Sequence, residues 1–355
     1  MAEAAAGINA ERLEEWFRAH IPEIEPPLSF EIIPGGHSNL TYRVTDSLGR
    51  RCVLRRPPLG AVLATAHDMA REHRIVSALA GSAVPVPPIL GLCRDESVNG
   101  APFYVMDFVE GVVLDETATA ERLLPQPQRA GLGFDVIEVL AKLHAVDADA
   151  AGVGDLGRRG DYLKRQLKRW HTQWENSKTR ELPAMEESHA VLQANLPEQI
   201  GFSIVHGDYR IGNMLVAEGA RGAAGWRIAA VLDWELCTLG DPLADLGYLL
   251  NNWAEPGDPP LPTARGAAMT PTSAPGFPSR AELLERYEAQ SGRNASHIDY
   301  YRAFQYWRSA AIIEGVLSRY LKGVMGRQAD TDLFRAQVDG LAEAALLRIR
   351  ELQAG

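Results

Sequence analysis

One short stretch constrains this chain more than any other: residues 205–215, which read VHGDYRIGNML. It places a carboxylate, Asp208, five residues before a carboxamide, Asn213, in a loop that contains two glycines. A second carboxylate, Asp233, ends the apolar run 228–232. One Asp that accepts a proton, with an Asn and an Asp that hold a divalent metal ion, is what phosphoryl transfer from ATP requires.

Each acidic residue also has a simpler interpretation. An Asp in a Gly-containing loop is commonly a turn former, and an Asp at the end of a strand is often a cap. The five-residue spacing from Asp208 to Asn213, taken together with the downstream Asp233, favours the catalytic interpretation.

The composition excludes several classes of function. A chain of 355 residues is long enough for two lobes. Its net charge of −10 argues against nucleic acid or an anionic membrane as partner, and no run of about 18 apolar residues predicts a membrane span. The cysteines, Cys52, Cys93 and Cys237, show neither a disulfide framework nor a zinc pattern. The charge is compatible with a cationic substrate. We therefore expect a cytoplasmic protein, in an oligomeric state that the sequence leaves open.

The first hundred residues are predicted to form a sheet with two helices. Asn9 is a suitable N-cap for a helix over 9–20, and strands are expected at 30–33, 51–56, 89–94 and 103–109. A small-residue turn, 35–39, runs into an alternating strand that ends near Val44. Gly36 would let backbone N–H groups approach a phosphate, and Ser38 or Asn39 would add side-chain bonds. A plain hairpin turn is the alternative.

A charged pair is expected inside this region. The predicted helix 65–79 carries Glu72 on the same stripe as Met69, Val76 and Leu79. An unpaired carboxylate on an apolar stripe is costly, so we expect a cationic partner, and Arg55 on the strand 51–56 is the candidate. A Glu72 that reaches solvent at the edge of the stripe is the alternative.

The second part of the chain is predicted to be mostly helical. Helices are expected at 132–144, 161–175, 280–291, 297–323 and 332–352, with a connector at 125–128 and a long Pro-rich loop at 255–279. The helix 161–175 has a basic side, read either as a solvated face or as a contact for a phosphate-bearing substrate. The predicted fold class is therefore α+β and bilobal, with an N-terminal lobe over 1–108 and a C-terminal lobe over 109–355.

These pieces, in this order, resemble the aminoglycoside phosphotransferase family of the protein-kinase-like superfamily. The motifs HGDYRIGN at 206–213 and LDWE at 232–235, followed by GDPLADLGY at 240–248, are most similar to the kinase-like domains associated with acyl-CoA dehydrogenases. The resemblance extends from about Gly35 to the last predicted helices. It implies a protein-kinase-like fold with an antiparallel N-terminal sheet and a helical C-terminal lobe.

The resemblance also implies roles for individual residues. Asp208 would be the catalytic base, and Arg210 would lie near the γ-phosphate. Mg²⁺ would bind Asn213 and Asp233. Met106, Asp107 and Val109 would form the hinge that binds the adenine of ATP. On the nucleotide side, the resemblance implies contacts from Gly36, Ser38, Asn39, Arg55 and Glu72. His206, Asp241 and Asp245 would have structural roles, as braces or caps of the loop.

One departure from the kinase pattern concerns the nucleotide Lys. The chain has no Lys before Lys142, so Arg55 occupies the position of the Lys that contacts ATP phosphates and pairs with the helix Glu. An Arg can bridge a phosphate and Glu72, although the exchange is not neutral. The resemblance implies an ATP-dependent kinase that phosphorylates a hydroxyl of a small molecule. The acceptor is either a hydroxylated metabolite, such as a hydroxyacyl-CoA or hydroxy acid, or an aminoglycoside-like compound. A nucleotide-binding pseudokinase is the alternative.

Overall fold

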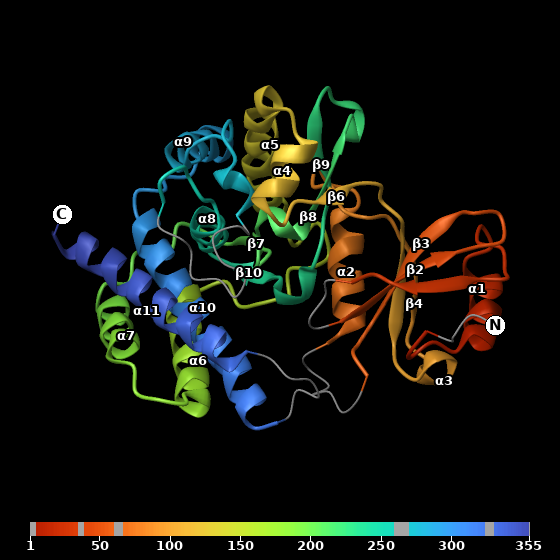
Figure 1. Cartoon of the computed structure of the whole chain (residues 1–355), viewed down its shortest axis with the longest axis horizontal. Coiled ribbons are helices and arrows are strands. Elements are labelled where there is room, and N and C mark those ends of the chain that lie inside the picture. Colours follow the sequence, from red (N-terminus) through yellow and green to blue (C-terminus); the bar gives the residue numbers. More distant parts are fainter. Residues whose placement is uncertain (1–4, 35–38, 60–66, 259–269, 324–329, 355) are drawn as a thin grey trace.

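The structure is a computed structural model, and it describes residues 5–34, 39–59, 67–258, 270–323 and 330–354. A sheet with three helices occupies one end of the molecule, and helices with short strands form the rest (Figure 1). The first sheet is antiparallel, in the order β1-β2-β3-β5-β4. Its strands and helices are α1 (Ala10–His20), β1 (Ser29–Ile32), β2 (Leu40–Thr45), β3 (Arg51–Arg56), α2 (Met69–Leu79), β4 (Ile89–Cys93), α3 (Glu96–Asn99) and β5 (Phe103–Asp107).

The second part contains two small sheets among the helices. One pairs β7 (Ser203–Val205) with β10 (Thr238–Gly240), and the other is ordered β6-β8-β9. The remaining elements are β6 (Val112–Val113), α4 (Thr117–Leu123), α5 (Gln126–Ala145), α6 (Tyr162–Ser177), α7 (Pro183–Ala194), η1 (Ile211–Asn213), β8 (Met214–Glu218), η2 (Ala220–Gly222), β9 (Trp226–Val231), η3 (Trp234–Leu236), α8 (Pro242–Asn251), η5 (Pro271–Ser273), α9 (Arg280–Ser291), α10 (Ile298–Leu321) and α11 (Thr331–Ala354).

Two hydrophobic cores hold these parts together. The smaller core lies between α1 and the first sheet, where Phe17 packs with Leu54 and Val105. The larger core fills the helical part and includes the apolar stripe of α2, from Ile75 to Leu79. Helix α2 therefore packs into the larger core although it precedes β4 in the chain. Its fixed position matters for the site, because α2 carries Glu72.

Several sequence predictions are confirmed. The α+β class is correct, with an antiparallel N-terminal sheet followed by a mostly helical part. Asn9 caps α1 through its side chain, which accepts a hydrogen bond from the Arg12 N–H. Helix α9 covers 280–291 as predicted, and Ser279 and Glu282 form a capping box at its start. The division into lobes at residue 108 stays a prediction.

Other boundaries were wrong for physical reasons. Residues 126–128 of the predicted connector 125–128 belong to α5, with Pro125 as its N-cap, because Pro127 lies in the first helical turn, where a missing N–H costs nothing. Helix α2 begins at Met69 after its N-cap Asp68, and the strand predicted to reach residue 109 ends at Asp107. The part of the predicted loop 255–279 that the structure describes includes η5, whose Thr272 is buried.

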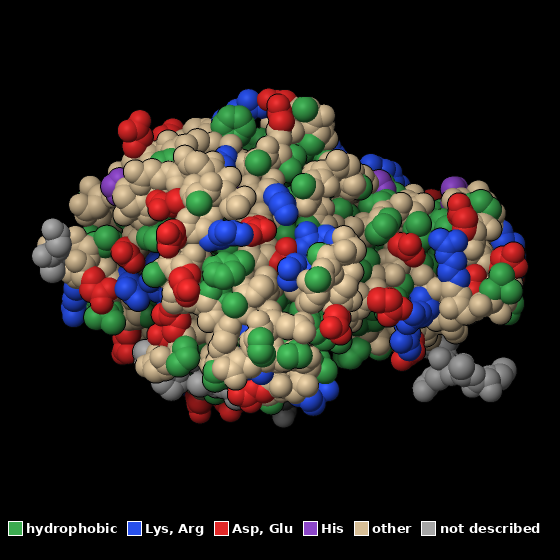
Figure 2. All heavy atoms as spheres, turned by 90° about the horizontal axis from the view of Figure 1, so that it is seen from above, with side chains coloured by type: hydrophobic (Ala, Val, Ile, Leu, Met, Phe, Trp, Pro, Cys, Tyr) green, Lys and Arg blue, Asp and Glu red, His purple; other side chains and the backbone are tan. Residues whose placement is uncertain are grey.

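The surface carries both signs of charge. On the face shown in Figure 2, acidic and basic side chains are interspersed with apolar ones. Within the described ranges, no helix is both long enough and apolar enough to cross a membrane.

Gly247 allows α8 to approach α10 closely. A Cβ at this position would lie 2.9 Å from the backbone carbon of Tyr301, too close without a shift of backbone. Gly247→Ala should therefore lower the free energy of unfolding by about 1–2 kcal/mol, because overpacking outweighs the gain in helix propensity. Urea denaturation measures the change.

The matched control is Gly131→Ala in α5. There the nearest atom to a new Cβ would be Nη1 of the flexible Arg227 side chain, at 3.3 Å. This substitution should stabilise the protein by up to about 1 kcal/mol. Equal effects at the two positions would contradict close packing at Gly247.

Candidate active site

The loop between β7 and β8 carries Asp208 and Asn213, and its shape depends on Gly207. This glycine has a φ of +85°, and a Cβ there would lie 2.7 Å from the carbonyl oxygen of Leu236. A residue with a side chain is therefore disfavoured for two reasons: its backbone would be strained at this positive φ, and its Cβ would clash with the Leu236 carbonyl oxygen. The close approach brings the loop against η3, the turn that follows Asp233.

Two buried side chains brace this loop. The Asp245 carboxylate on α8 accepts the backbone N–H of His206 at 2.6 Å and of Gly207 at 2.9 Å. The His206 ring contacts the Leu232 carbonyl oxygen through Nε2 at 2.9 Å, and its Nδ1 accepts the N–H of Asp208 at 3.2 Å. The structural roles predicted for His206 and Asp245 are thus confirmed. Asp241 is also structural, since it caps α8 and accepts a hydrogen bond from Tyr301.

Asp208 has one carboxylate oxygen engaged and one oxygen without a hydrogen bond. Its Oδ2 accepts a hydrogen bond from Nδ2 of Asn213 at 2.8 Å. Its Oδ1 is buried and has no partner at hydrogen-bond distance in the described part of the chain, although the phenol of Tyr248 lies near enough to the carboxylate to interact with it. The Nε atom of Arg210 lies 3.6 Å from Oδ1, at ion-pair distance. A buried carboxylate oxygen without a donor is costly, so Oδ1 is poised to accept a hydrogen bond from a bound group.

Asn213 and Asp233 are brought together by the backbone. The N–H of Leu232 donates to the carbonyl oxygen of Asn213 at 2.9 Å, which fixes Asp233 beside the loop. Asp233 adopts a left-handed backbone, with φ 66° and ψ 63°, a conformation that is uncommon outside glycine and clusters at functional sites. The side-chain Nδ2 of Asn213 donates both of its N–H groups to Asp208. The side-chain oxygen, Oδ1, is therefore the atom of this amide that can accept a hydrogen bond or coordinate a metal. A carboxylate and an amide oxygen suit Mg²⁺, so the pair fits the predicted metal.

Arg55 connects the first sheet to this site. Its Nε lies 3.0 Å from Oε2 of Glu72, which confirms the predicted pair, and its Nη2 lies 2.7 Å from Oδ1 of Asp233. Glu72 also accepts hydrogen bonds from Tyr104 at 3.2 Å and from Asn39 at 3.0 Å. One guanidinium therefore bridges a carboxylate on α2 and the carboxylate predicted to bind metal.

The electrostatics of this group follow from burial and charge. Burial disfavours the charged guanidinium of Arg55, but the carboxylates of Glu72 and Asp233 outweigh it and raise the pKa of Arg55. Burial raises the pKa of Glu72 against the opposing charge of Arg55. At Arg210, burial again opposes the charged form, while Asp208 and Asp233 hold its pKa above the usual value. Both arginines are therefore permanent cations beside the acidic site residues.

The predicted hinge follows β5. Met106 pairs with Val53 of β3 and Asp107 with Cys52, so both are held by the sheet. Val109 lies just beyond the strand, and its backbone makes no hydrogen bond within the ranges that the structure describes. Its N–H is thus available to an adenine edge. The nucleotide role of these three residues stays a prediction.

The predicted phosphate loop is described only at its end. Gly36 and Ser38 lie outside the described residues. Asn39 is buried, its Nδ2 faces Glu72, and its Oδ1 lies 2.8 Å from Nδ1 of His67. The side chain of Asn39 thus braces Glu72, and its predicted contact with phosphate stays a prediction.

Two contributors to the site were missed by the sequence reading. Arg308 on α10 donates through Nη1 to the carbonyl oxygen of Gly207 at 3.1 Å. Tyr248 on α8 lies near Asp208. Burial raises the pKa of its phenol, and the negative charge of the Asp208 carboxylate raises it further. The motif at 240–248 includes Tyr248 and could have drawn attention to it. No local pattern marks Arg308, which lies among the buried aromatic residues of α10.

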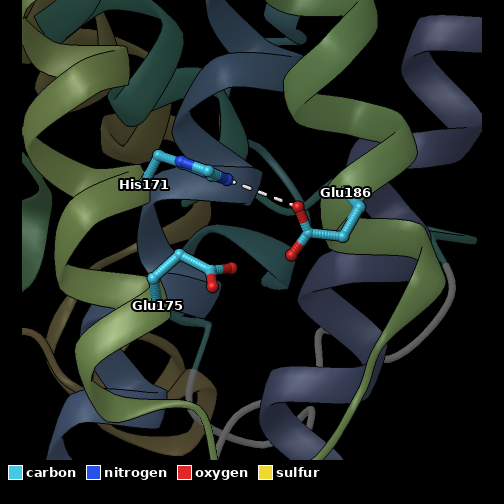
Figure 3. A group of neighbouring side chains, drawn as sticks. All are labelled: His171, Glu175 and Glu186. Atoms are coloured by element: carbon cyan, nitrogen blue, oxygen red, sulfur yellow. Dashed lines mark hydrogen bonds and ion pairs between the residues drawn. The ribbon is translucent and has the colours of Figure 1, made fainter.

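A second cluster of polar side chains lies away from the loop. His171 and Glu175 of α6 face Glu186 of α7 (Figure 3), and their ligand atoms lie within 4.8 Å of one another. Each carboxylate already has a partner: Glu186 accepts from Trp174 at 2.8 Å and contacts His171 at 3.3 Å, and Glu175 pairs with Lys178 at 3.1 Å. These contacts tie α6 to α7 and account for the cluster as a structural one.

Comparison with known proteins decides the family. The sequence profile described as the phosphotransferase enzyme family, abbreviated APH, matches residues 29–283. The chain belongs to this family. The match includes the catalytic loop, Asp233, Arg55 and Glu72, whereas Tyr301 and Arg308 lie beyond it on α10.

Similar proteins agree with this assignment. A solved protein from Ralstonia eutropha, described as a candidate aminoglycoside phosphotransferase, is 34% identical, with a TM-score of 0.79 over 96% of this family member and 98% of that chain. The GDP complex of aminoglycoside 2'-phosphotransferase-IIIa shares the fold, with 16% identity, a TM-score of 0.61 and coverage of 95% and 99% of the two chains. The family member described here therefore has the kinase-like fold of these phosphotransferases.

A curated relative is much longer. The mouse protein named acyl-CoA dehydrogenase family member 10 is 37% identical over 292 residues, which are 81% of this chain and 26% of that protein. The phosphotransferase-family chain thus corresponds to about a quarter of this relative.

The buried pair of Arg55 and Glu72 gives a test of stability. Their side chains are 13% and 3% exposed, so removal of the guanidinium leaves a buried carboxylate unpaired. Arg55→Met should lower the free energy of unfolding by about 3 kcal/mol, measured by chemical denaturation. The control is Arg43→Met on the adjacent β2, whose partner Glu31 is exposed. That change should cost at most about 1 kcal/mol, and similar losses would show that the Arg55 pair is not buried in solution.

Asp245 gives a test by pH. His144 and the Gly207 N–H are among the contacts that keep its pKa below the usual value despite burial. Its contribution to stability is therefore complete above the unfolded pKa, about 4, and is lost as the pH falls through the lower folded pKa. Asp245→Asn removes that contribution and places an amide N–H against one of the two backbone donors. It should cost about 2 kcal/mol at pH 7.

The difference from the parent protein should shrink as the pH falls below about 4. Burial lowers the pKa of His144 and the Asp245 carboxylate opposes that shift, so both proteins are compared in a His144→Gln background, in which titration of His144 does not enter the difference. Exposed Asp115, replaced by Asn, serves as control and should leave the curve unchanged. A constant Asp245→Asn difference from pH 7 to pH 3 would refute the linkage. Denaturant unfolding across that range provides the measurement.

Proposed function

We propose that this chain is an ATP-dependent phosphotransferase that transfers the γ-phosphate to a hydroxyl group of a small molecule. The observation that supports the proposal most is the free Oδ1 of Asp208, a buried oxygen without a donor beside two oxygen-bearing side chains suited to Mg²⁺. Asp208 is the base: Oδ1 accepts the hydrogen bond of the acceptor hydroxyl and then its proton. Asn213 holds the other oxygen, so the carboxylate cannot rotate away.

Asn213 and Asp233 are the residues that would hold the metal. Mg²⁺, when bound, neutralises charge on the transferred phosphate and its leaving group. The amide of Asn213 is oriented by its two hydrogen bonds to Asp208, and the carboxylate of Asp233 is oriented by Arg55. Both groups are thus set in place before the nucleotide arrives, which is how preorganised sites lower a barrier.

The two arginines would divide the phosphate charge between them. Arg210 is next to Asp208, and its pKa is raised by that carboxylate and by Asp233. Arg55 takes the place of the usual Lys and can offer a second N–H to a phosphate while it keeps Glu72. Met106, Asp107 and Val109 would contact the adenine through their backbone, and Gly36, Ser38 and Asn39 would contact the phosphates.

The surroundings of Asp208 favour an acceptor that is neutral or anionic. Arg210 and Arg308 both lie against the loop, whereas a polycationic aminoglycoside would need additional carboxylates there. The relative named acyl-CoA dehydrogenase family member 10 points in the same direction. We therefore favour a hydroxylated metabolite, such as a hydroxyacyl-CoA or hydroxy acid, over an aminoglycoside-like compound.

One observation favours a second function. The ion pair of Arg55 with Asp233 occupies the carboxylate predicted to bind metal, as in a protein that binds nucleotide with little turnover. A thermal shift with ATP in the presence and absence of Mg²⁺ separates the two functions. A kinase should show a shift that grows with Mg²⁺, followed by ATP-dependent product formation. A pseudokinase should bind nucleotide without turnover.

Replacement of the base tests the proposed chemistry. Asp208→Asn keeps the size of the side chain but removes the proton acceptor, so phosphotransfer should fall by at least about 100-fold. The binding of ATP and Mg²⁺, measured as a thermal shift, should change little, because Asp208 does not hold the nucleotide. Undiminished turnover in this variant would overturn the assignment of the base. A loss of nucleotide binding would show that Asp208 acts on the nucleotide instead.

A further inference from the structure

A groove of about 420 Å³ lies between α6 and α10, two helices that pack side by side in the helical part (Figure 1). This volume is within the usual range for ligand sites, roughly 300–1,000 Å³. The nine residues that line it are Arg169, Thr172, Gln173, Asn176, Ser177, Gly315, Ser318, Arg319 and Lys322. We call these residues the α6–α10 groove.

The charge of the groove is opposite to that of the protein. Three of its residues, Arg169, Arg319 and Lys322, are cationic and none is acidic, although the chain carries a net charge of −10. Within the described part of the chain, none of the three forms an ion pair with a carboxylate. Lys178, just after α6, pairs with Glu175, whereas Lys164, Arg165 and Lys168 on α6 also form no ion pair within the described residues; the groove differs from the rest of α6 in that three cations from two helices line one recess without a carboxylate. The groove therefore offers positive charge that no carboxylate of the described chain neutralises.

The neutral residues add hydrogen-bond donors and room. The side-chain amides of Gln173 and Asn176 make no hydrogen bonds within the described residues. Gly315 forms part of the floor, where a Cβ would lie 3.1 Å from Nε2 of Gln173. A donor-rich recess with two guanidinium groups matches phosphate oxygens, which accept bidentate hydrogen bonds from arginine.

A chain of contacts joins the groove to the catalytic loop. Arg169 lies over the ring of Trp170, with its guanidinium carbon 5.1 Å from the ring centroid. Arg308 lies over the same ring at 5.3 Å and donates to the carbonyl oxygen of Gly207, next to Asp208. One indole therefore contacts both a residue of the groove and the residue that donates to the carbonyl oxygen next to Asp208.

We propose that the α6–α10 groove binds the phosphate groups of a phosphate-bearing acceptor and so positions its hydroxyl at Asp208. The inference rests on the proposed phosphotransferase function and narrows its acceptor to an organic phosphate, of which an acyl-CoA is one example. The phosphates bound here are distinct from those of ATP, which belong to the site formed by Arg55, Asn213 and Asp233.

The test uses coenzyme A as probe and isothermal titration calorimetry on the full chain. A non-hydrolysable ATP analogue and Mg²⁺ are present at saturation, so that the nucleotide part of the probe cannot occupy the ATP site. Coenzyme A should bind, and Arg319→Gln with Lys322→Gln should weaken binding at least tenfold. Pantetheine, which lacks the phosphates, should bind at least tenfold more weakly than coenzyme A to the parent protein.

The control variant replaces Lys164 and Lys168 by Gln. These cations are exposed on the same helix α6 but do not line the groove, so the substitutions remove equal charge and no residue of the lining, and they should leave binding within about twofold, since charges exposed to solvent are partly screened. Equal weakening by both double variants, or no effect of the groove variant, would overturn the groove assignment. So would inorganic pyrophosphate binding as tightly as coenzyme A, because the site would then recognise charge alone.

The experiments distinguish a failure of the phosphate-binding groove from a failure of the proposed phosphotransferase function. Binding of the ATP analogue, measured before the probe is added, reports on the proposed nucleotide site, and Asp208-dependent phosphotransfer to any hydroxyl acceptor reports on the function. Analogue binding without probe binding would refute the groove and leave the function standing. Probe binding without analogue binding would count against the kinase, and it would support the groove only where Arg319→Gln with Lys322→Gln weakens it.

Discussion

The site depends on one buried carboxylate that does no chemistry. Asp245 receives the N–H groups of two consecutive residues, His206 and Gly207, at 2.6 and 2.9 Å. These bonds fix the backbone immediately before Asp208, and His206 then fixes Leu232, the residue before Asp233. The base and one metal-binding side chain thus take their positions from the same anion on α8. A buried charge that accepts several backbone hydrogen bonds is satisfied and directional, whereas an apolar residue there would leave both N–H groups unpaired.

Arg55 is the second constraint, and it couples the two parts of the molecule. Its guanidinium joins Glu72 on α2 to Asp233 beyond β9, while the apolar stripe of α2 packs into the larger core. A lysine ammonium is a compact charge without the fixed fork of a guanidinium, so the planar group of Arg55 is suited to hold both carboxylates at once. The cost is competition: a cation bound at Asp233 must share this carboxylate with Arg55.

The sequence predicted what local spacing encodes. The interval from Asp208 to Asn213 lies within one loop and appears as the bond at 2.8 Å, and alternation along β3 together with helical spacing on α2 was enough to pair Arg55 with Glu72. Contacts that depend on the packing of distant helices were not predictable. Arg308 reaches the loop across 101 residues, and nothing in the periodicity of α10 separates it from its buried neighbours. Which residue donates to a loop carbonyl oxygen depends on the tertiary structure, because it depends on which helix packs against the loop.

The distribution of charge links the site to its acceptor. Acidic residues outnumber basic ones by 46 to 36, yet Arg210 and Arg308 lie among the acidic residues of the catalytic loop, and the α6–α10 groove contains Arg169, Arg319 and Lys322 without a carboxylate. Surface charge in an acidic protein repels anions at long range, so an anionic ligand gains affinity only where local cations are held close and unpaired. Arg308 and Arg169 are held by a shared indole, Trp170, which keeps them in place without neutralising them. This arrangement preserves positive charge next to the base, and an acceptor that carries its own phosphate is the class of small molecule that uses it.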